Sequence, residues 1–351
     1  MARIGIVSLR FNPAFVQHQI AFIKLIKEMG HEPVCILDGS YEKFPEIREL
    51  SSVINPRCDL GSLNLTHAIF LNASPVNRKA ASAMKENGAK IFYVLHEPRQ
   101  PVLKFLWAEG PRVGVKGLLA HCTSVPLIKL ADVVLLASHF AISAYDGSDR
   151  KHNENRAYFP LIFDDESQPD ITSLLPAKRY LGFIGGLCRA HGFDRFFQFM
   201  REELQKGSDL KFLIASRHPL PAEIRNDDIV RNNKNKLSLR CGRPLSNSEM
   251  NRAYAECFCI WNVYRRSTQS GVLPKAFMFG TPVLASTVGS FPEFVEDGSN
   301  GRFVKGQGHQ GIAEALREMR TNLGRYATSC RKTFREQFFY QSSLKRFEDL
   351  L

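Results

Sequence analysis

The sequence predicts an α/β protein of two doubly wound, Rossmann-like domains in tandem. Three observations predict it: short apolar runs alternate with segments of helical period, the alternation restarts after a polar stretch, and 351 residues suit two ordinary cores. The expected parts are a first domain at residues 1–165, a linker at 166–176, a second domain at 177–330 and a C-terminal helix at 331–351. A return of that helix to the first domain is one option.

The first half contains six apolar runs suited to buried parallel strands and two helical segments. The first helix stops at Gly30 and the second at Gly88. The strands are expected at Arg3–Leu9, Pro33–Leu37, Ala68–Leu71, Lys90–Leu95, Ala131–Ala137 and Ala157–Phe163, with helices at Ala14–Met29 and Asn77–Asn87.

A polar stretch, Asp164–Pro176, has two prolines and no periodicity, which is typical of a linker. After it the pattern restarts and ends in two terminal helices. We expect strands at Arg179–Ile184, Leu210–Ile214, Lys236–Leu239, Cys257–Asn262, Pro282–Ala285 and Gly301–Val304, and helices at Phe193–Leu204, Ser248–Ala255, Gly271–Phe279 and near Phe291–Glu296.

Composition excludes several classes of protein. Hydrophobic residues make up 44% and charged residues 23%, as in globular domains. Lys116, His121 and Lys129 interrupt the most apolar stretch, so no spanning helix is expected. The first nine residues are too strand-like for a secretory signal, which predicts a cytoplasmic protein. The eight scattered cysteines are interpreted as reduced packing residues rather than metal ligands.

The positive charge is concentrated in the second half. The net charge is +12, of which residues 1–165 carry +3 and the rest +9. Nucleic acid is not an expected partner, because the chain has no basic block, no interleaving of aromatic and basic residues and no helix-turn-helix spacing. Phosphates on a small molecule, or an anionic membrane surface, remain as ligands.

Two loops of the second half could hold an anion. Gly185 and Gly186 follow a strand and lead through Arg189 and His191 into a helix, an arrangement that suits a phosphate but also an ordinary tight turn. In the second loop, Ser270-Gly271 opens a helix and Arg265, Arg266 and Lys275 surround its start. Ser270 as a simple N-cap and the cations as a solvated face are the alternatives.

The stretch Trp261–Gly301 resembles the donor-site signature of GT-B glycosyltransferases of the family 4, or group 1, type. Its Gln269-Ser270-Gly271-Val272 loop is similar to a branch met among bacterial enzymes that build surface polysaccharides. Weaker similarity covers 183–186, 244–246 and 30–34. The resemblance implies two Rossmann-like domains facing across a cleft, with a nucleotide-sugar bound chiefly by the second and an acceptor by the first. It also implies retention of anomeric configuration without a bound metal or cofactor.

On this resemblance, the catalytic residues are His96, Ser267 and Thr268. The family's paired glutamates fall on Ser267 and Lys275, and neither is a carboxylate. In the family the second glutamate accepts hydrogen bonds from the ribose, which Lys275 cannot do; we expect its ammonium to face the donor's diphosphate or ribose, with solvent as the alternative. The donor-binding residues are then Gly185, Gly186, Arg189, His191, Arg265, Arg266, Gln269, Ser270, Gly271, Val272 and Lys275.

The first half contributes residues that follow its strands. His96 comes directly after the run at 90–95, where the family places a histidine near the sugar and phosphate. The loop after the first strand suggests acceptor contacts by Asn12, Gln17 and His18. Glu97 is either an acceptor-side base or a partner of Arg99, and we favour the partner.

The stretch Pro101–Trp107, with Arg112, Lys116 and Lys129, suits either a membrane surface or an ordinary core helix.

The function expected from the sequence is transfer of a sugar from a nucleoside-diphosphate sugar to a glycan or polyprenyl-diphosphate-linked glycan in polysaccharide biosynthesis. The inner face of the cell membrane is a candidate location. A non-catalytic GT-B protein that binds a nucleotide or glycan as a partner subunit is the alternative, because the two glutamates are missing.

Overall fold

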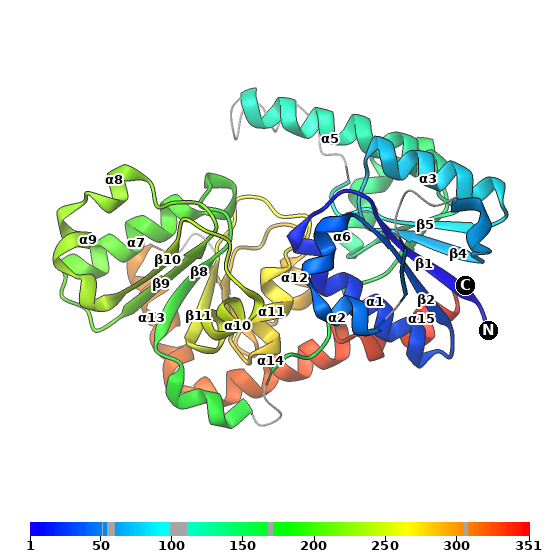
Figure 1. Cartoon of the computed structure of the whole chain (residues 1–351). Coiled ribbons are helices and arrows are strands. Elements are labelled where there is room, and N and C mark those ends of the chain that lie inside the picture. Colours follow the sequence, from blue (N-terminus) through cyan, green and yellow to red (C-terminus); the bar gives the residue numbers. More distant parts are fainter. Residues whose placement is uncertain (51, 55–59, 99–110, 168–170, 305–307) are drawn as a thin grey trace. The chain divides into compact units, whose positions relative to one another are not determined.

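The computed structural model describes the chain except residues 51, 55–59, 99–110, 168–170 and 305–307. The chain divides into two compact units (Figure 1). The first is Met1–Asp164 together with Gln337–Leu351, and the second is Asp165–Glu336. The boundaries therefore lie at 164/165 and 336/337, whereas the sequence placed the linker at 166–176 and the C-terminal segment at 331–351.

The first unit is a doubly wound parallel sheet. Its described strands form a seven-stranded sheet in the order β3-β2-β1-β4-β5-β6-β7. The strands are β1 Arg3–Ser8, β2 Glu32–Leu37, β3 Ser52–Ile54, β4 His67–Phe70, β5 Lys90–Val94, β6 Val133–Leu136 and β7 Arg156–Tyr158. The helices are α1 Val16–Glu28, α2 Pro45–Leu50, α3 Pro75–Glu86, α5 Pro111–Leu130, α6 His139–Asp146 and α15 Leu344–Glu348.

Successive residues of β2 in the first unit belong to opposite cores. Cys35 and Leu37 of β2 pack in one apolar cluster with α1, while Val34 and Ile36 pack in a second with α3 and α5. Burial of each such side chain contributes about 1.5–3 kcal/mol. Because helices cover both faces of the sheet, a ligand is expected to bind at the ends of its parallel strands.

The second unit repeats this plan. Its described strands form a six-stranded sheet in the order β10-β9-β8-β11-β12-β13. The strands are β8 Tyr180–Ile184, β9 Lys211–Ser216, β10 Leu237–Cys241, β11 Cys257–Asn262, β12 Val283–Ala285 and β13 Gly301–Phe303. The helices are α7 Phe193–Gln205, α8 Ala222–Arg225, α9 Asp228–Asn232, α10 Asn247–Ala255, α11 Val272–Met278, α12 Phe291–Phe294, α13 His309–Thr321 and α14 Leu323–Gln337.

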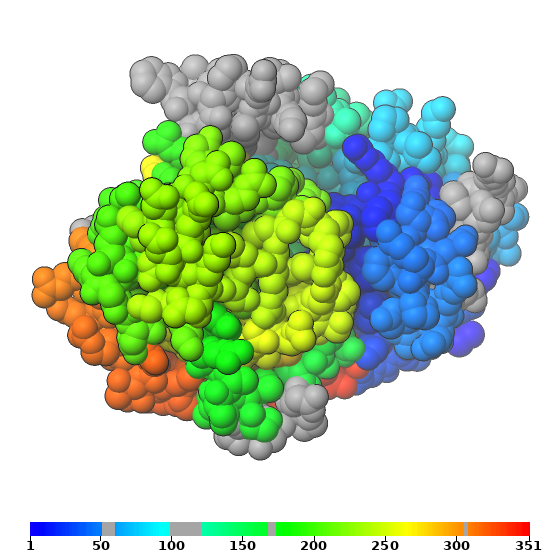
Figure 2. Space-filling view, turned by 60° about the vertical axis from the view of Figure 1, so that its left-hand side comes forward, coloured from blue at the N-terminus to red at the C-terminus, as the bar shows by residue number. Residues whose placement is uncertain are grey.

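Helices of the second unit are anchored by aromatic residues. Phe196 and Phe199 of α7 contact Trp261 of β11, and Met319 of α13 joins the same cluster. The orange stretch that includes α13 lies against the green part of this unit (Figure 2). Within the described residues, no helix combines the length and apolarity needed to cross a membrane.

The predicted fold class is confirmed, and the differences have local causes. The expected strand at 157–163 shortens to β7, because Pro160 has no N–H to donate to a ladder. The sequence offered α5 only as the core-helix alternative for the stretch with Arg112, Lys116 and Lys129, because Gly114, Gly117 and Pro126 weaken its helical period. It also missed the short strand β3, which has only three residues.

Candidate functional site

The predicted donor residues of the second unit lie in two loops that follow neighbouring strands. The first loop, residues 185–192, follows β8, and the second, residues 263–271, follows β11, which pairs with β8 in parallel. Because the carboxyl ends of parallel strands meet at one edge of the sheet, the two loops lie together.

Glycine is required where the first loop approaches the second. Gly185 has a φ of +125° and donates its N–H to the Ala215 carbonyl at 2.9 Å. Gly192 has a φ of +70°, and a Cβ built on it would lie 2.1 Å from the Val263 carbonyl oxygen. The approach of the two loops thus depends on the absence of a side chain at Gly192.

Backbone and ring contacts join the two loops. The Arg265 N–H donates to the Ala190 carbonyl at 2.8 Å. The His191 ring stacks on Tyr264 with centroids 4.6 Å apart, and its Nδ1 is 3.3 Å from the Gly186 carbonyl oxygen. These contacts bring the predicted donor residues of both loops into one site.

The arginines of the loops share one acidic residue. The Arg265 guanidinium pairs with Asp194 of α7 at 2.5 Å, and Arg189 approaches the same carboxylate at 4.0 Å. The Arg189 side chain is exposed, while that of Arg265 is about one-third exposed. The loops therefore combine positive charge with backbone N–H groups.

The loop after β11 also holds buried polar atoms. Ser267 Oγ and both polar atoms of the Asn262 side chain have no hydrogen-bond partner among the described residues. Ser267 is 8% exposed and Asn262 is fully buried. Gly289 has a φ of +62° and packs closely against the backbone of Ser267. A Cβ built on Gly289 would lie 1.7 Å from the Ser267 carbonyl oxygen. Such atoms usually find a partner in bound water or a ligand.

Ser270 does not cap the following helix. Helix α11 begins at Val272 with Gly271 as its N-cap and no side-chain capping bond. Ser270 bonds instead to the Tyr264 hydroxyl; burial raises the pKa of Tyr264 to about 12, and the Ser270 bond opposes that rise. The N-cap interpretation of Ser270 is therefore wrong. Gln269 is partly buried, and Thr268 is buried beside Ser267.

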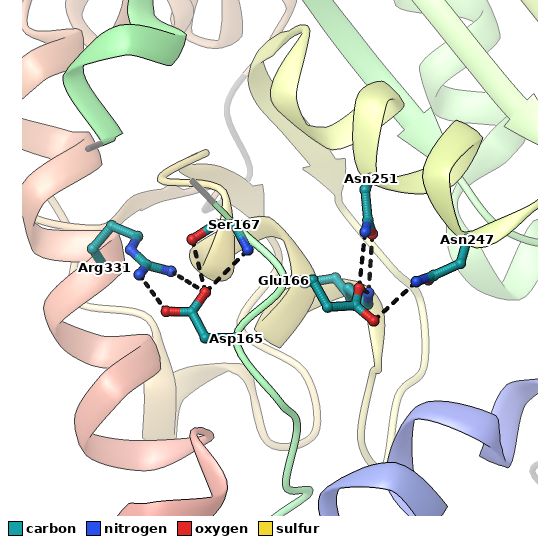
Figure 3. A network of polar contacts seen from close by, with 7 residues as sticks. Asp165, Glu166, Ser167, Asn247, Asn251 and Arg331 are labelled. Carbon is teal, nitrogen blue, oxygen red and sulfur yellow. Dashed lines mark hydrogen bonds and ion pairs between the residues drawn. The ribbon is translucent and has the colours of Figure 1, made fainter. Parts of the chain in front are cut away.

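The structure corrects both expectations for Lys275. This residue is 8% exposed, and its ammonium forms an ion pair with Glu166 and donates to Asn251 Oδ1 at 3.0 Å. Glu166 also accepts hydrogen bonds from the side-chain amides of Asn247 and Asn251, each at 2.9 Å (Figure 3). The ammonium therefore points neither to solvent nor to an open anion site, because a buried cation needs a carboxylate.

A second ion pair holds the residue before Glu166. Both oxygens of Asp165 accept hydrogen bonds from the Arg331 guanidinium of α14, and Ser167 donates to the same carboxylate (Figure 3). Burial acts to raise the pKa of Asp165, but these bonds outweigh it and lower the pKa. Sequence reasoning assigned 165–167 to the linker region and missed both acidic residues, for which no local motif exists.

In the first unit, two predicted residues lie next to each other. The His96 ring stacks on Phe15 with centroids 4.6 Å apart, and its centroid is 6.0 Å from that of His18. His96 Nε2–H donates to the Leu71 carbonyl at 3.1 Å, and His18 Nδ1–H donates to Ile162 at 3.0 Å. The candidate catalytic residue and one candidate acceptor residue thus share a site.

His96 is held in its neutral form. Burial, together with the nearby His18, lowers its pKa to about 3, although the Leu71 hydrogen bond opposes both effects. At neutral pH the imidazole can therefore exchange hydrogen bonds but cannot carry positive charge to a phosphate.

The other residues that the sequence singled out in the first unit have the following positions. The side chain of Asn12 accepts the Ala14 N–H and begins a short helical turn, and Gln17 is half-buried. Glu97 is exposed. Arg99, its expected partner, and the stretch Pro101–Trp107 lie outside the described residues, as do the side chains of Arg112 and Lys116. Lys129 is exposed.

Comparison with known proteins adds a family match over part of the chain and a fold. Residues 178–322 match the family described as Glycosyl transferases group 1. No curated protein matches the chain. Among solved structures, Alr3699/HepE from Anabaena in complex with UDP aligns with a TM-score of 0.67 at 16% identity, covering 100% of this chain and 99% of that one. The fold is GT-B.

Two further GT-B structures align over nearly their whole length. Sucrose-phosphate synthase from Thermosynechococcus elongatus has a TM-score of 0.68 and 13% identity, with 100% of this chain and 98% of that chain covered. The UDP-forming α,α-trehalose-phosphate synthase from Burkholderia xenovorans, in complex with glucose-6-phosphate, has a TM-score of 0.61 and 13% identity, with 99% and 100% covered. The matched residues 178–322 include the two loops at 185–192 and 263–271.

Proposed function

We propose that the chain is a glycosyltransferase that moves a sugar from a nucleoside-diphosphate sugar to a hydroxyl of a glycan. The observation that carries this proposal is the joined pair of loops, 185–192 and 263–271. They present glycine backbone, arginines and buried polar atoms at one sheet edge, inside the residues that match the glycosyltransferase family.

In the proposed mechanism, the second unit stabilises the departing diphosphate. The N–H groups of Gly271, Val272 and Leu273 lie at the beginning of α11, where peptide dipoles favour negative charge. Arg189, Arg265 and Arg266 add positive charge, so that no metal ion is required. Preorganised donors of this kind act on the charge that develops as the bond to the sugar breaks. The acceptor hydroxyl attacks from the same face, and the anomeric configuration is retained.

His96 serves this proposal as a neutral hydrogen-bonding group. Its Nε2–H is directed at Leu71, which fixes the ring, and its low pKa keeps it uncharged at neutral pH. We place it against a sugar hydroxyl, with Asn12, Gln17 and His18 as the acceptor side. Ser267 and Thr268 contact the transferred sugar in the place of the missing glutamate.

Glu166 replaces the second missing glutamate. A lysine at 275 cannot accept a hydrogen bond from a ribose, but it holds the Glu166 carboxylate, which can accept one. The acceptor carboxylate thus comes from the segment 165–167 instead of from α11.

We further propose a lipid-linked or polysaccharide acceptor and work at the inner face of the cell membrane. The net charge of +12 and the exposed Lys129 support contact with an anionic surface.

The test is a panel of nucleoside-diphosphate sugars, with release of the nucleoside diphosphate as the readout and oligosaccharide or polyprenyl-linked acceptors present. Release with at least one donor supports the enzyme. Binding of a donor without release under any condition would favour the non-catalytic partner subunit, for which the comparisons give no support. No thermal shift with any common nucleoside diphosphate at millimolar concentration would contradict the donor site itself, since ligand at 100 times its Kd adds about 2.7 kcal/mol.

A further inference from the structure

Two histidines and an aspartate of the first unit meet between α5 and the turn that follows α6. His121 lies on α5, and Asp149 and His152 lie in the turn. One possible ligand atom from each of the three lies within 4.8 Å of the others. His121 Nδ1 is 3.6 Å from Asp149 Oδ1. The proposed sugar transfer uses none of these residues.

The carboxylate of this group is deeply buried. Asp149 is 1% exposed, and its Oδ2 accepts a hydrogen bond from Ser148 Oγ at 3.1 Å. His121 and His152 are partly exposed, so solvent reaches the imidazole side of the group. A cation that enters past the two imidazoles would therefore meet this carboxylate at the buried side of the group.

Hydrogen bonds hold the two contributing elements in register. The His152 N–H donates to the Asp149 carbonyl at 2.8 Å. The side-chain amide of Asn153 donates to the carbonyls of Ile128 and Ala131, at the end of α5. The Tyr145 hydroxyl of α6 donates to the Asn153 carbonyl at 2.8 Å. The histidine on α5 and the two residues of the turn are therefore positioned before any ion binds.

We propose that His121, Asp149 and His152 bind a divalent transition-metal ion of the Zn²⁺ type. Two imidazole nitrogens and one carboxylate oxygen are ligands that Zn²⁺ prefers, and three protein ligands leave a fourth position for water. Zn²⁺ bonds of about 2.0–2.1 Å place tetrahedral ligand atoms about 3.3 Å apart. The three ligand atoms, now within 4.8 Å of one another, would draw together to that spacing when the ion binds.

The ion would clamp α5 to the segment that leads into β7. Asp149 and His152 precede β7, whereas His96 and the loop with Asn12 follow the ends of β5 and β1. Asp149 and His152 therefore lie toward the opposite edge of the sheet from His96 and Asn12, and the proposed metal-independent sugar transfer does not depend on the ion.

The test uses the full chain, stripped with EDTA and then freed of chelator. We expect calorimetry with Zn²⁺ alone to show one equivalent bound and Zn²⁺ to raise the Tm. Co²⁺ should give the visible absorption of a tetrahedral site. His121→Ala and His152→Ala should each weaken Zn²⁺ binding by more than about tenfold, while His218→Ala, which removes an exposed histidine outside the group, should leave it unchanged.

Absence of stoichiometric binding, or equal affinity in wild type and His152→Ala, would overturn the site. His152→Ala decides the matter even if His121→Ala fails to fold, because His152 lies in a partly exposed turn. Nucleoside-diphosphate binding by His152→Ala should equal that of wild type. If His152→Ala lost both Zn²⁺ binding and nucleoside-diphosphate binding, the substitution would have damaged the fold as a whole, and the metal site would then have to be abandoned.

Discussion

Removing the charge of Glu166 should destabilise the second unit strongly. The side chains of Glu166 and Lys275 are only 16% and 10% exposed, so Glu166→Gln leaves an ammonium buried without its carboxylate. Loss of one partner of a buried pair costs about 3–5 kcal/mol. The variant Glu166→Gln/Lys275→Met removes both charges and should lie within about 1–2 kcal/mol of wild type. The double variant should then be about 1–4 kcal/mol more stable than Glu166→Gln.

Denaturant unfolding followed by tryptophan fluorescence measures these differences, because Trp261 is buried in the same unit. The matched control is Asp209→Asn, which breaks an exposed pair with Arg320 in the same unit and should cost less than about 1 kcal/mol. The reasoning fails if Glu166→Gln costs no more than Asp209→Asn, or if the double variant is as unstable as the single one.

The double variant also tests the proposed contact between Glu166 and the ribose. Wild type should bind a ribonucleoside diphosphate about 10- to 150-fold more tightly than its 2′- or 3′-deoxy analogue, since a hydrogen bond to a charged group contributes about 1.5–3 kcal/mol. Glu166→Gln/Lys275→Met should bind the ribonucleotide and the deoxynucleotides almost equally. Unchanged discrimination in a folded double variant would show that Glu166 does not contact the ribose.

Three further changes have defined outcomes. His96→Ala should lower kcat by about 10²–10³-fold. Because the pKa of His96 is about 3 in the folded chain and 6.5 in the unfolded chain, wild type loses stability as the pH falls from 6.5 to 3. The variant should lose less stability over that range, as a pH series of unfolding curves would show. Lys178→Met should stabilise the chain by about 2–3 kcal/mol at pH 7, since burial lowers the pKa of Lys178 to about 8, and the gain should shrink as the pH approaches 10.5, as urea unfolding at both pH values would show. Gly192→Ala should abolish donor binding measured by calorimetry, whereas Gly207→Ala, with a similar φ of +72° but open space around its Cβ, should cost about 1 kcal/mol and bind donor normally.

The sequence was sufficient to predict features that depend on neighbours along the chain. The strand β11 has the predicted bounds, Cys257–Asn262, because an unbroken apolar run can only be buried on both faces of a sheet. The loops at 185–192 and 263–271 were located for the same reason, since glycines and polar residues directly follow apolar runs. The helical period also placed α1, which stops before Gly30, whose φ is +75°.

The ion pairs could not be predicted, because their partners are far apart in the sequence. Lys275 and Glu166 are 109 positions apart, and Arg331 and Asp165 are 166 positions apart. A polar stretch with two prolines has the composition of a linker whether or not its carboxylates are buried. Its role became visible only when the fold placed it beside α10, α11 and α14.

These pairs change how the net charge of the second unit bears on its function. Lys275 and Arg331 are neutralised by Glu166 and Asp165, and Arg240 is likewise paired with Glu256. Cations held in this way stabilise the unit but contribute little attraction to a ligand, because their field is cancelled at short range. The excess of +9 counted over residues 166–351 therefore overstates the charge available to a diphosphate. That charge comes from the arginines of the two loops. Asp194 pairs closely with Arg265 and only distantly with exposed Arg189, so we expect Arg189 to contribute the most positive charge.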